Sequence, residues 1–198
     1  MALTDVLVIG GGIVGQVTAI RLAEAGARVT LVDAGINAGS TANAGSLHVQ
    51  MQSRFMRLYP DQVPNIEASL PFYKAAAEAW VALDAEFGPF ELVRKGGLML
   101  AENAAQMAFL EGKSKRESAK GLSVEMLDRA ALDRVAPWLG PQIVGAELCH
   151  DEGKLNPLVA NARLRDVGCG LGITLVSDWI SGVELSGSGV SAIGERAT

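Results

Sequence analysis

A glycine-rich turn near the start of the chain has the spacing of a phosphate-binding loop. Gly10, Gly12 and Gly15 form a G-x-G-x-x-G pattern between a short apolar run and a helical pattern. The first glycine would allow a tight turn, the second would let the backbone approach a pyrophosphate, and the third would let the helix pack on the sheet. The helix N-terminus would offer N–H groups and a positive dipole end to phosphates. The pattern therefore predicts a dinucleotide site, with a glycine-rich turn that binds nothing as the alternative.

An acidic residue, Asp33, ends the next predicted strand. An acid about 20 residues after such a turn usually accepts hydrogen bonds from the adenosine ribose. Its negative charge disfavours a 2′-phosphate, which argues against NADP. The pattern by itself leaves FAD and NAD both open.

The elements that must position these residues form a β–α–β unit. Both predicted strands are short apolar runs rich in β-branched residues, and the helix between them carries apolar residues on one face. The unit consists of a strand over 6–9, a helix that begins at residue 13 and stops at Gly26, and a strand over 29–33.

The rest of the chain is predicted to mix helices and strands. We first expect a loop with a short helical turn over 34–52, then a helix over 69–87 with Ser69 as its N-cap and Pro71 in its first turn, and then a hairpin of strands at 92–93 and 98–100. Next we expect a helix over 104–119, a strand over 122–126, a short helix capped by Asp128 and a strand over 143–149. The last predicted elements are a helix from Pro157 to about Val167, strands over 173–176 and 180–185, and a hairpin turn over 186–189. This order predicts two lobes, one made of residues 1–52 and 156–198 and the other of residues 53–155.

Three parts of the chain resemble the D-amino-acid oxidase superfamily of flavoproteins. They are the opening 5–15 with the following 22–26, the stretch 40–45, and the turn 151–157 that leads into a helix. Residues 41–45, Thr-Ala-Asn-Ala-Gly, are most similar to D-amino-acid dehydrogenases and to their glycine oxidase and sarcosine oxidase relatives. The resemblance implies FAD as the cofactor and an α/β fold: a Rossmann-like FAD-binding lobe with an inserted α+β substrate lobe, truncated relative to the family.

The resemblance also implies that the loop after the second strand runs along the FAD pyrophosphate. Hydroxyls and backbone N–H groups there can bond phosphate oxygens, and a small-residue surface loop is the alternative. Relatives usually have Glu where this chain has Asp33, and the loop lacks the His that some relatives use to attach FAD covalently. The predicted cofactor-binding residues are Gly10, Gly12, Ile13, Val14, Gly15, Asp33, Ala34, Ser40, Thr41, Asn43, Ala44 and Gly45.

By resemblance, the reaction is oxidation of a C–N bond in an amino acid or N-methylated amine, with hydride transfer to the flavin. Family members are about twice as long, and the groups that hold their substrate carboxylate lie mostly in the half that this chain lacks. We therefore assign no catalytic residue. Two alternatives stay open: a non-catalytic chain, either truncated or in need of a partner polypeptide, and an NAD-dependent dehydrogenase.

Three residues just past the loop are weaker candidates. His48 could lie near the flavin, and Arg54 and Arg57 could pair with a substrate carboxylate. A solvent-facing or hydrogen-bonded side chain is the simpler interpretation of His48. Exposed charges or neighbours of the phosphates are the simpler interpretation of Arg54 and Arg57. The two histidines have no metal-ligand spacing, so no metal is predicted.

Composition limits the partners and the compartment. The 198 residues are 49% apolar and 20% charged, which is typical of a globular chain. The net charge of −5, without a basic run, argues against nucleic acid. No apolar stretch approaches a membrane span, and residues 1–5 show no secretory signal, so a cytoplasmic location is expected, with peripheral membrane association left open. Cys149 and Cys169 are expected to be reduced thiols.

The predicted parallel strands should lie in the order 173–176, 29–33, 6–9. This order leaves the first strand at an apolar edge, which favours association with another chain. We therefore expect the 198-residue chain alone to be an incomplete enzyme.

Overall fold

A computed structural model of the chain describes residues 4–36, 39–187 and 189–195. These residues fold as two compact units, called unit 1 and unit 2 below. Unit 1 consists of Met1–Ala44, Phe87–Glu91 and Asn156–Thr198, and unit 2 of Gly45–Glu86 and Leu92–Leu155. The two lobes predicted from the sequence divide the chain after residues 52 and 155. Which lobe binds the cofactor stays a prediction. Among the described residues, no helix is long and apolar enough to cross a membrane.

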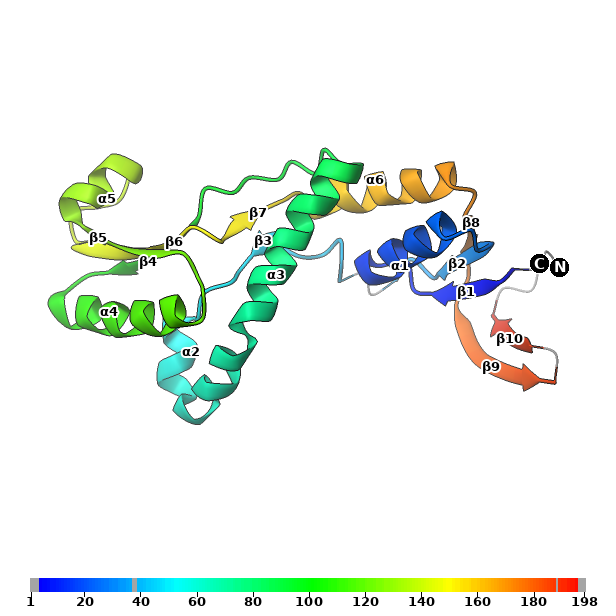
Figure 1. Ribbon diagram of the computed structural model, residues 1–198, viewed down its shortest axis with the longest axis horizontal. Coiled ribbons are helices and arrows are strands. Elements are labelled where there is room, and N and C mark those ends of the chain that lie inside the picture. Colours follow the sequence, from blue (N-terminus) through cyan, green and yellow to red (C-terminus); the bar gives the residue numbers. More distant parts are fainter. Residues whose placement is uncertain (1–3, 37–38, 188, 196–198) are drawn as a thin grey trace. The chain divides into compact units, whose positions relative to one another are not determined.

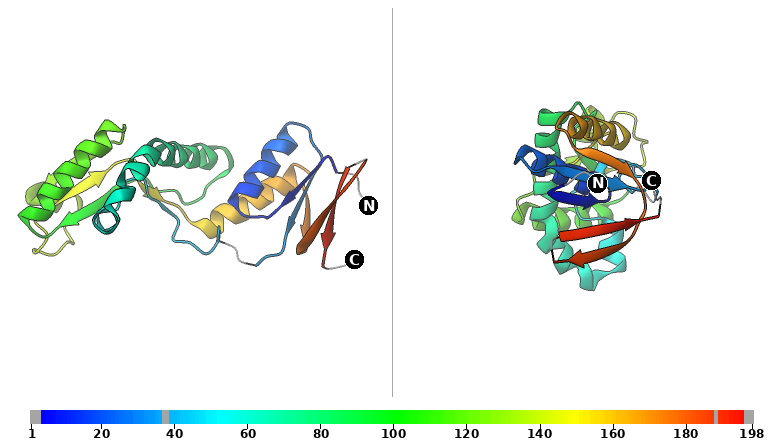
Figure 2. Two further views of the ribbon diagram at one scale, coloured as in Figure 1. Left: turned by 90° about the horizontal axis from the view of Figure 1, so that it is seen from below. Right: turned by 90° about the vertical axis from the view of Figure 1, so that its right-hand side faces the viewer.

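Unit 1 is built on a parallel sheet with the predicted strand order. Its strands β1 (Val6–Ile9), β2 (Val29–Asp33) and β8 (Thr174–Ser177) lie in the order β1-β2-β8. Two helices, α1 (Ile13–Glu24) and α6 (Pro157–Gly170), make the crossovers. Because both crossovers step in the same direction and parallel crossovers are right-handed, both helices lie on one face of the sheet (Figure 2).

An antiparallel hairpin completes unit 1. Its strands are β9 (Ile180–Ser186) and β10 (Gly189–Gly194), and Figure 2 shows them on the side of the sheet opposite the helices. The strand predicted over 180–185 is confirmed. β10 was not predicted from the sequence, because its glycines, serine and alanine form a weak strand pattern. The predicted turn over 186–189 includes Ser188, which lies outside the described residues.

Unit 2 contains an antiparallel sheet in the order β4-β6-β5 (Figure 1). Its strands are β4 (Gly97–Ala101), β5 (Val124–Asp128) and β6 (Gly145–Cys149), with α4 (Ala104–Ala119) and α5 (Arg129–Val135) between them in the chain. The predicted hairpin of 92–93 with 98–100 is wrong. β4 pairs with β6, whose five residues are all buried, and Val93 instead bridges to Lys154. β4 therefore pairs with the buried central strand β6 and not with residues 92–93.

The long helix of unit 2 begins earlier than predicted. After α2 (Ser53–Leu58) and a 3₁₀ turn (Pro60–Gln62), α3 runs over Val63–Phe87, so Pro71 lies inside the helix. The hydroxyl of Ser69 donates to the carbonyl of Asn65 (3.0 Å) instead of capping the helix. Val63, Leu70 and Ala77 are buried along one face, and this apolar contact extends the helix past its proline.

The remaining predictions are close to the observed elements. Asp128 caps α5 by accepting from the N–H of Ala131 (2.7 Å), and Asn156 caps α6 with Pro157 as its first residue. α6 continues three residues beyond the predicted end. Within the predicted loop 34–52, the two-residue strand β3 (Ser46–Leu47) pairs with β7 (Gly153–Lys154).

A buried ionic cluster joins α4 to the sheet of unit 2. The Lys113 ammonium donates to carboxylates of Glu117 (2.9 Å) and Glu147 (2.6 Å) and to the amide oxygen of Gln50 (3.0 Å). The side chains of Lys113 and both glutamates are fully buried. Burial raises the pKa of Glu117 to about 7, against the opposing effect of Lys113. We call Lys113, Glu117 and Glu147 the lysine–glutamate cluster.

Both cysteines are free thiols, as expected. Cys149 is buried on β6, and burial raises the pKa of its thiol to about 12. Cys169 is exposed on α6.

Candidate cofactor site

The turn between β1 and α1 requires glycine at two of its predicted positions. Gly10 has φ +106°, a conformation that residues with a Cβ rarely adopt. A Cβ on Gly15 would lie 1.8 Å from the carbonyl oxygen of Gly10. Gly10 therefore permits the turn, and Gly15 permits α1 to start directly against it.

The middle of the turn is enclosed by two residues from further along the chain. A Cβ on Gly11 would lie 2.8 Å from the Cβ of Asp33, and a Cβ on Gly12 would lie 2.8 Å from the hydroxyl oxygen of Ser40. That hydroxyl accepts from the N–H of Ile13 (2.9 Å), the first residue of α1. The N-cap residue Gly12 has no side chain, so Ser40 performs the capping role from 27 residues away.

Asp33 lies at the end of β2 and faces the glycine turn. Its carboxylate accepts from the N–H of Gly11 (2.5 Å) through Oδ2 and from the N–H of Gly35 (2.8 Å) through Oδ1. Its position at the strand end is as predicted. Contact with a ribose stays a prediction.

A buried amide pair ties the two helices of unit 1 to the loop. Gln16 on α1 donates through Nε2 to the carbonyl of Gly11 (2.7 Å) and to Oδ1 of Asn161 (3.1 Å). Asn161 on α6 donates to the carbonyls of Ser40 (2.9 Å) and Pro157 (2.7 Å). Neither residue was predicted from the sequence as part of the site. The available signal was a polar side chain at helical spacing between Ile13 and Ile20 on the apolar face of α1.

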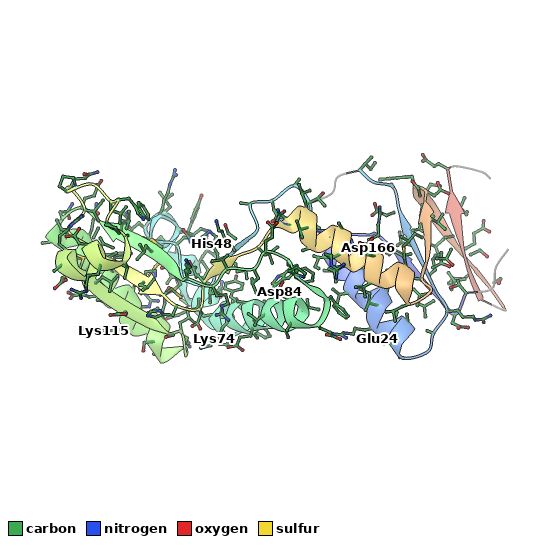
Figure 3. The ribbon with its side chains drawn as sticks, turned by 90° about the horizontal axis from the view of Figure 1, so that it is seen from above. Glu24, His48, Lys74, Asp84, Lys115 and Asp166 are labelled. Carbon is green, nitrogen blue, oxygen red and sulfur yellow. The ribbon has the colours of Figure 1, made fainter. Side chains whose placement is uncertain are left out.

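These residues surround a cavity of about 790 Å³ in unit 1. This volume lies within the range of small-molecule and cofactor pockets. Five predicted site residues line it: Gly10, Gly12, Asp33, Ser40 and Thr41. The lining residues that the sequence analysis did not name are Gly11, Gln16, Gly35, Ile36, Gly39, Leu158, Asn161, Ala162, Arg165 and Asp166. Asp166, labelled in Figure 3, and Arg165 come from α6.

The other predicted site residues do not line this cavity. Val14 points to solvent with 77% of its surface exposed, and Ala34 lines a separate hollow with Trp179. Asn43 donates to the carbonyls of Gly39 (2.9 Å) and Ser40 (3.0 Å), so it shapes the loop. Gly45 belongs to unit 2, where its carbonyl accepts from Leu155 (2.9 Å). The rest of this group are Ile13, Gly15 and Ala44.

The cavity has the chemical groups that a dinucleotide needs. Backbone without Cβ atoms forms the turn at Gly11 and Gly12, and the positive end of the α1 dipole begins at Ile13. Arg165 contributes a guanidinium suited to a phosphate, and Asp33 contributes a carboxylate suited to sugar hydroxyls. The buried Oε1 of Gln16 has no hydrogen-bond partner among the described residues. The residues present therefore fit a pyrophosphate-containing nucleotide.

The three weaker candidates all belong to unit 2. His48 follows β3, and its Nδ1 lies 3.4 Å from Oε1 of the buried Glu152, with 65% of the His48 side chain exposed (Figure 3). Arg54 and Arg57 are exposed on α2.

Known proteins with similar sequences or folds include several oxidoreductases. The chain is 29% identical over 163 residues to the gamma-glutamylputrescine oxidoreductase of Escherichia coli strain K12, an alignment that covers 78% of this chain and 37% of that protein. Its fold is similar to that of the L-alpha-glycerophosphate oxidase of Mycoplasma pneumoniae, solved with FAD bound (TM-score 0.77, 20% identity, 100% of this chain and 51% of that chain). It is also similar in fold to the glycine oxidase of Geobacillus kaustophilus (TM-score 0.70, 22% identity, 97% of this chain and 51% of that chain). The chain thus spans about half the length of these structures and 37% of the curated relative.

A family model described as DAO, FAD dependent oxidoreductase, matches residues 5–198. The match includes the glycine turn, Asp33, the loop that carries Ser40, and α6 with Asn161. The cofactor of this family is FAD, in agreement with the expectation from the sequence. The chain belongs to the DAO family of FAD dependent oxidoreductases.

Proposed function

We propose that unit 1 binds FAD and that the chain serves in the oxidation of a C–N bond of an amino acid or amine. The observation that carries the proposal is the cavity at the glycine turn. Ser40, which caps α1, and Asp33, at the end of β2, both line this cavity. FAD, when bound, supplies the acceptor for the hydride. The residues of this chain bind and orient it.

Each part of the cavity has a role in this proposal. The turn at Gly12 and the N-terminus of α1 would hold the pyrophosphate, with the Arg165 guanidinium as an additional partner. Asp33 would accept from the ribose hydroxyls. The amides of Gln16 and Asn161 would keep the turn, the loop and both helices in register. In domain terms, residues 1–52 and 156–198 would form the FAD-binding lobe and residues 53–155 part of a substrate lobe.

The substrate class rests on the relatives and on the resemblance of the loop. The names of two proteins reported above contain an amine or an amino acid, gamma-glutamylputrescine and glycine. The glycerophosphate oxidase is the contrasting relative, because its named substrate carries an alcohol. We assign no catalytic residue, and a second polypeptide that completes the site is part of the proposal. A cytoplasmic location stays a prediction from the sequence.

Replacement of Gly12 by Val tests the cofactor site. The added side chain would begin 2.8 Å from the Ser40 hydroxyl oxygen and would occupy the base of the cavity. We expect FAD binding, measured by titration of the wild-type and variant proteins with FAD, to be lost in the variant. Gly112→Val is the matched control, because a Cβ on Gly112 in α4 meets nothing within 4 Å.

Two further measurements make this test decisive. Circular dichroism of both variants shows whether the fold survives, and Gly12→Ala provides a smaller change if the Val variant unfolds. A folded Gly12→Val protein with unchanged FAD affinity would show that the cofactor binds elsewhere. Stoichiometric binding of NAD in place of FAD would favour the dehydrogenase alternative.

A further inference from the structure

Unit 2 contains a second cavity that the proposed function does not use. It has a volume of about 450 Å³, and residues of α2, β4 and α4 line it. Its volume falls within the range of small-molecule pockets. Its lining includes Ser53, Arg54 and Arg57 from α2, Met99 and Leu100 from β4, and Phe109 from α4.

Two arginines on one face of α2 give this cavity its charge. Arg54 and Arg57 are three residues apart, so their side chains are neighbours on the helix surface. Neither forms an ion pair with any residue that the structure describes, whereas Arg116 in the same unit pairs with both oxygens of Glu67 (2.9 Å each). Arg57 instead lies over the ring of Phe109, 5.8 Å from its centroid. Two unpaired like charges at this spacing repel one another, and a bound anion would relieve that repulsion.

The rest of the lining separates into an apolar surface and a buried hydroxyl. Met99 and Leu100 from β4 and Phe109 and Leu110 from α4 form the apolar surface. Ser53 is only 9% exposed, and its hydroxyl oxygen has no hydrogen-bond partner among the described residues. A buried hydroxyl without a partner costs free energy unless a ligand or water satisfies it.

We propose that this cavity binds a carboxylate with an apolar tail. The guanidinium groups of Arg54 and Arg57 match a carboxylate in charge and in planar donor geometry, and the Ser53 hydroxyl provides one more donor. The tail lies on the side chains of Met99, Leu100 and Phe109. All of these residues belong to unit 2, so binding does not require FAD in unit 1.

Isothermal titration calorimetry of the 198-residue protein with three probes tests the proposal. Octanoate, octanol and octyltrimethylammonium share an alkyl chain and differ in the charge of the head group. We expect octanoate to bind, octanol to bind at least tenfold more weakly, and octyltrimethylammonium to show no binding. Equal affinity for octanoate and octanol, or no binding of octanoate, would overturn the proposal.

Variants locate the binding in this cavity. Arg54→Gln and Arg57→Gln should each weaken octanoate binding about tenfold, and Arg134→Gln, an exposed arginine on α5 outside the cavity, should leave it unchanged. Ser53→Ala should weaken binding without lowering the melting temperature, because the hydroxyl has no protein partner to lose. Unchanged octanoate affinity in the Arg54→Gln, Arg57→Gln double variant would place any binding elsewhere. The Gly12→Val protein should still bind octanoate, which separates this proposal from the one on FAD.

Discussion

The Asp33 carboxylate shapes the glycine turn and, under the proposed function, would also bind the ribose of the cofactor. Its two oxygens hold the N–H groups of Gly11 and Gly35, which fixes the glycine turn against the end of β2. A carboxylate has further lone pairs on both oxygens, so it can accept from a ribose while it keeps these two bonds. Under the proposed function, the structural role and the ribose-binding role would coincide at this residue.

Asp33→Asn should weaken FAD binding by about 1 to 3 kcal/mol, the range for loss of a hydrogen bond to a charged group. The amide replaces one acceptor oxygen with a donor NH₂, which would face a backbone N–H of Gly11 or Gly35. The measurement is a titration of both proteins with FAD. Asp166→Asn is the control, because it makes the same change of charge in the same cavity. Tighter binding by Asp33→Asn than by Asp166→Asn would contradict the ribose role.

At the scale of the elements, the contact of α4 with the central strand β6 includes the lysine–glutamate cluster. One ammonium and two carboxylates are fully buried there, and Oε1 of Glu147 has no partner among the described residues. The backbone N–H of Met51 donates to Glu117 (2.5 Å). The buried Glu152 accepts from Gln50, which itself accepts from Lys113. With both glutamates ionised, the cluster would carry a net negative charge inside the protein, so it favours a proton on Glu117.

The raised pKa of Glu117 makes stability depend on pH in a defined direction. The folded state holds a proton on Glu117 up to about pH 7, whereas the unfolded chain releases it near the ordinary carboxyl pKa of 4.5. The free energy of unfolding should therefore fall as the pH rises from about 4.5 to about 7, by at most about 3 kcal/mol. Urea unfolding at several pH values within this window measures the effect.

Variants on α4 separate the cluster from other titrating groups. Glu117→Gln resembles the protonated carboxyl, so the difference between it and the wild type should grow as the pH rises. Glu111→Gln, on the exposed side of the same helix, should retain the wild-type pH dependence. The interpretation fails if Glu117→Gln and the wild type show parallel pH profiles. Two other carboxylates of unit 2 lie near basic side chains: Asp151 lies 3.4 Å from Lys74 and 3.8 Å from Arg94, and Glu152 lies 3.4 Å from His48.

At the scale of the whole molecule, the chain spans about half the length of the structures it resembles. Within the described residues, β1 pairs with β2 alone, and Ile9 at its end is 52% exposed. A parallel strand is normally paired on both sides, so this edge can accept a further strand. The open edge of β1 therefore affects how well the isolated chain should bind FAD and turn over a substrate.

The 198-residue chain alone should bind FAD weakly and show no amine oxidation. The assay combines flavin retention after gel filtration with turnover of D-amino acids, glycine, sarcosine and glycerophosphate. Addition of a polypeptide equivalent to the remaining half of a relative should increase both retention and turnover. A monomeric, yellow and active 198-residue protein would refute this prediction.

The sequence by itself determined the features that depend on neighbouring residues. Apolar periodicity located β1, α1 and β2, and the glycine spacing located the turn. Asp128 as a cap located the start of α5, and Pro157 as a first-turn residue located the start of α6. These features are local because backbone geometry and caps involve residues within about one helical turn. The parallel strand order also followed, since short right-handed crossovers leave few arrangements.

Only the tertiary structure decided which distant residues meet. Ser40 caps α1 across 27 residues, and Gln16 bonds Asn161 across 145 residues. In the same way, β4 pairs with β6 and not with the nearby residues 92–93, and Lys113 pairs with Glu147 on the central strand. No local pattern marks such pairs, because each depends on which buried polar groups and apolar surfaces the packed elements bring into contact.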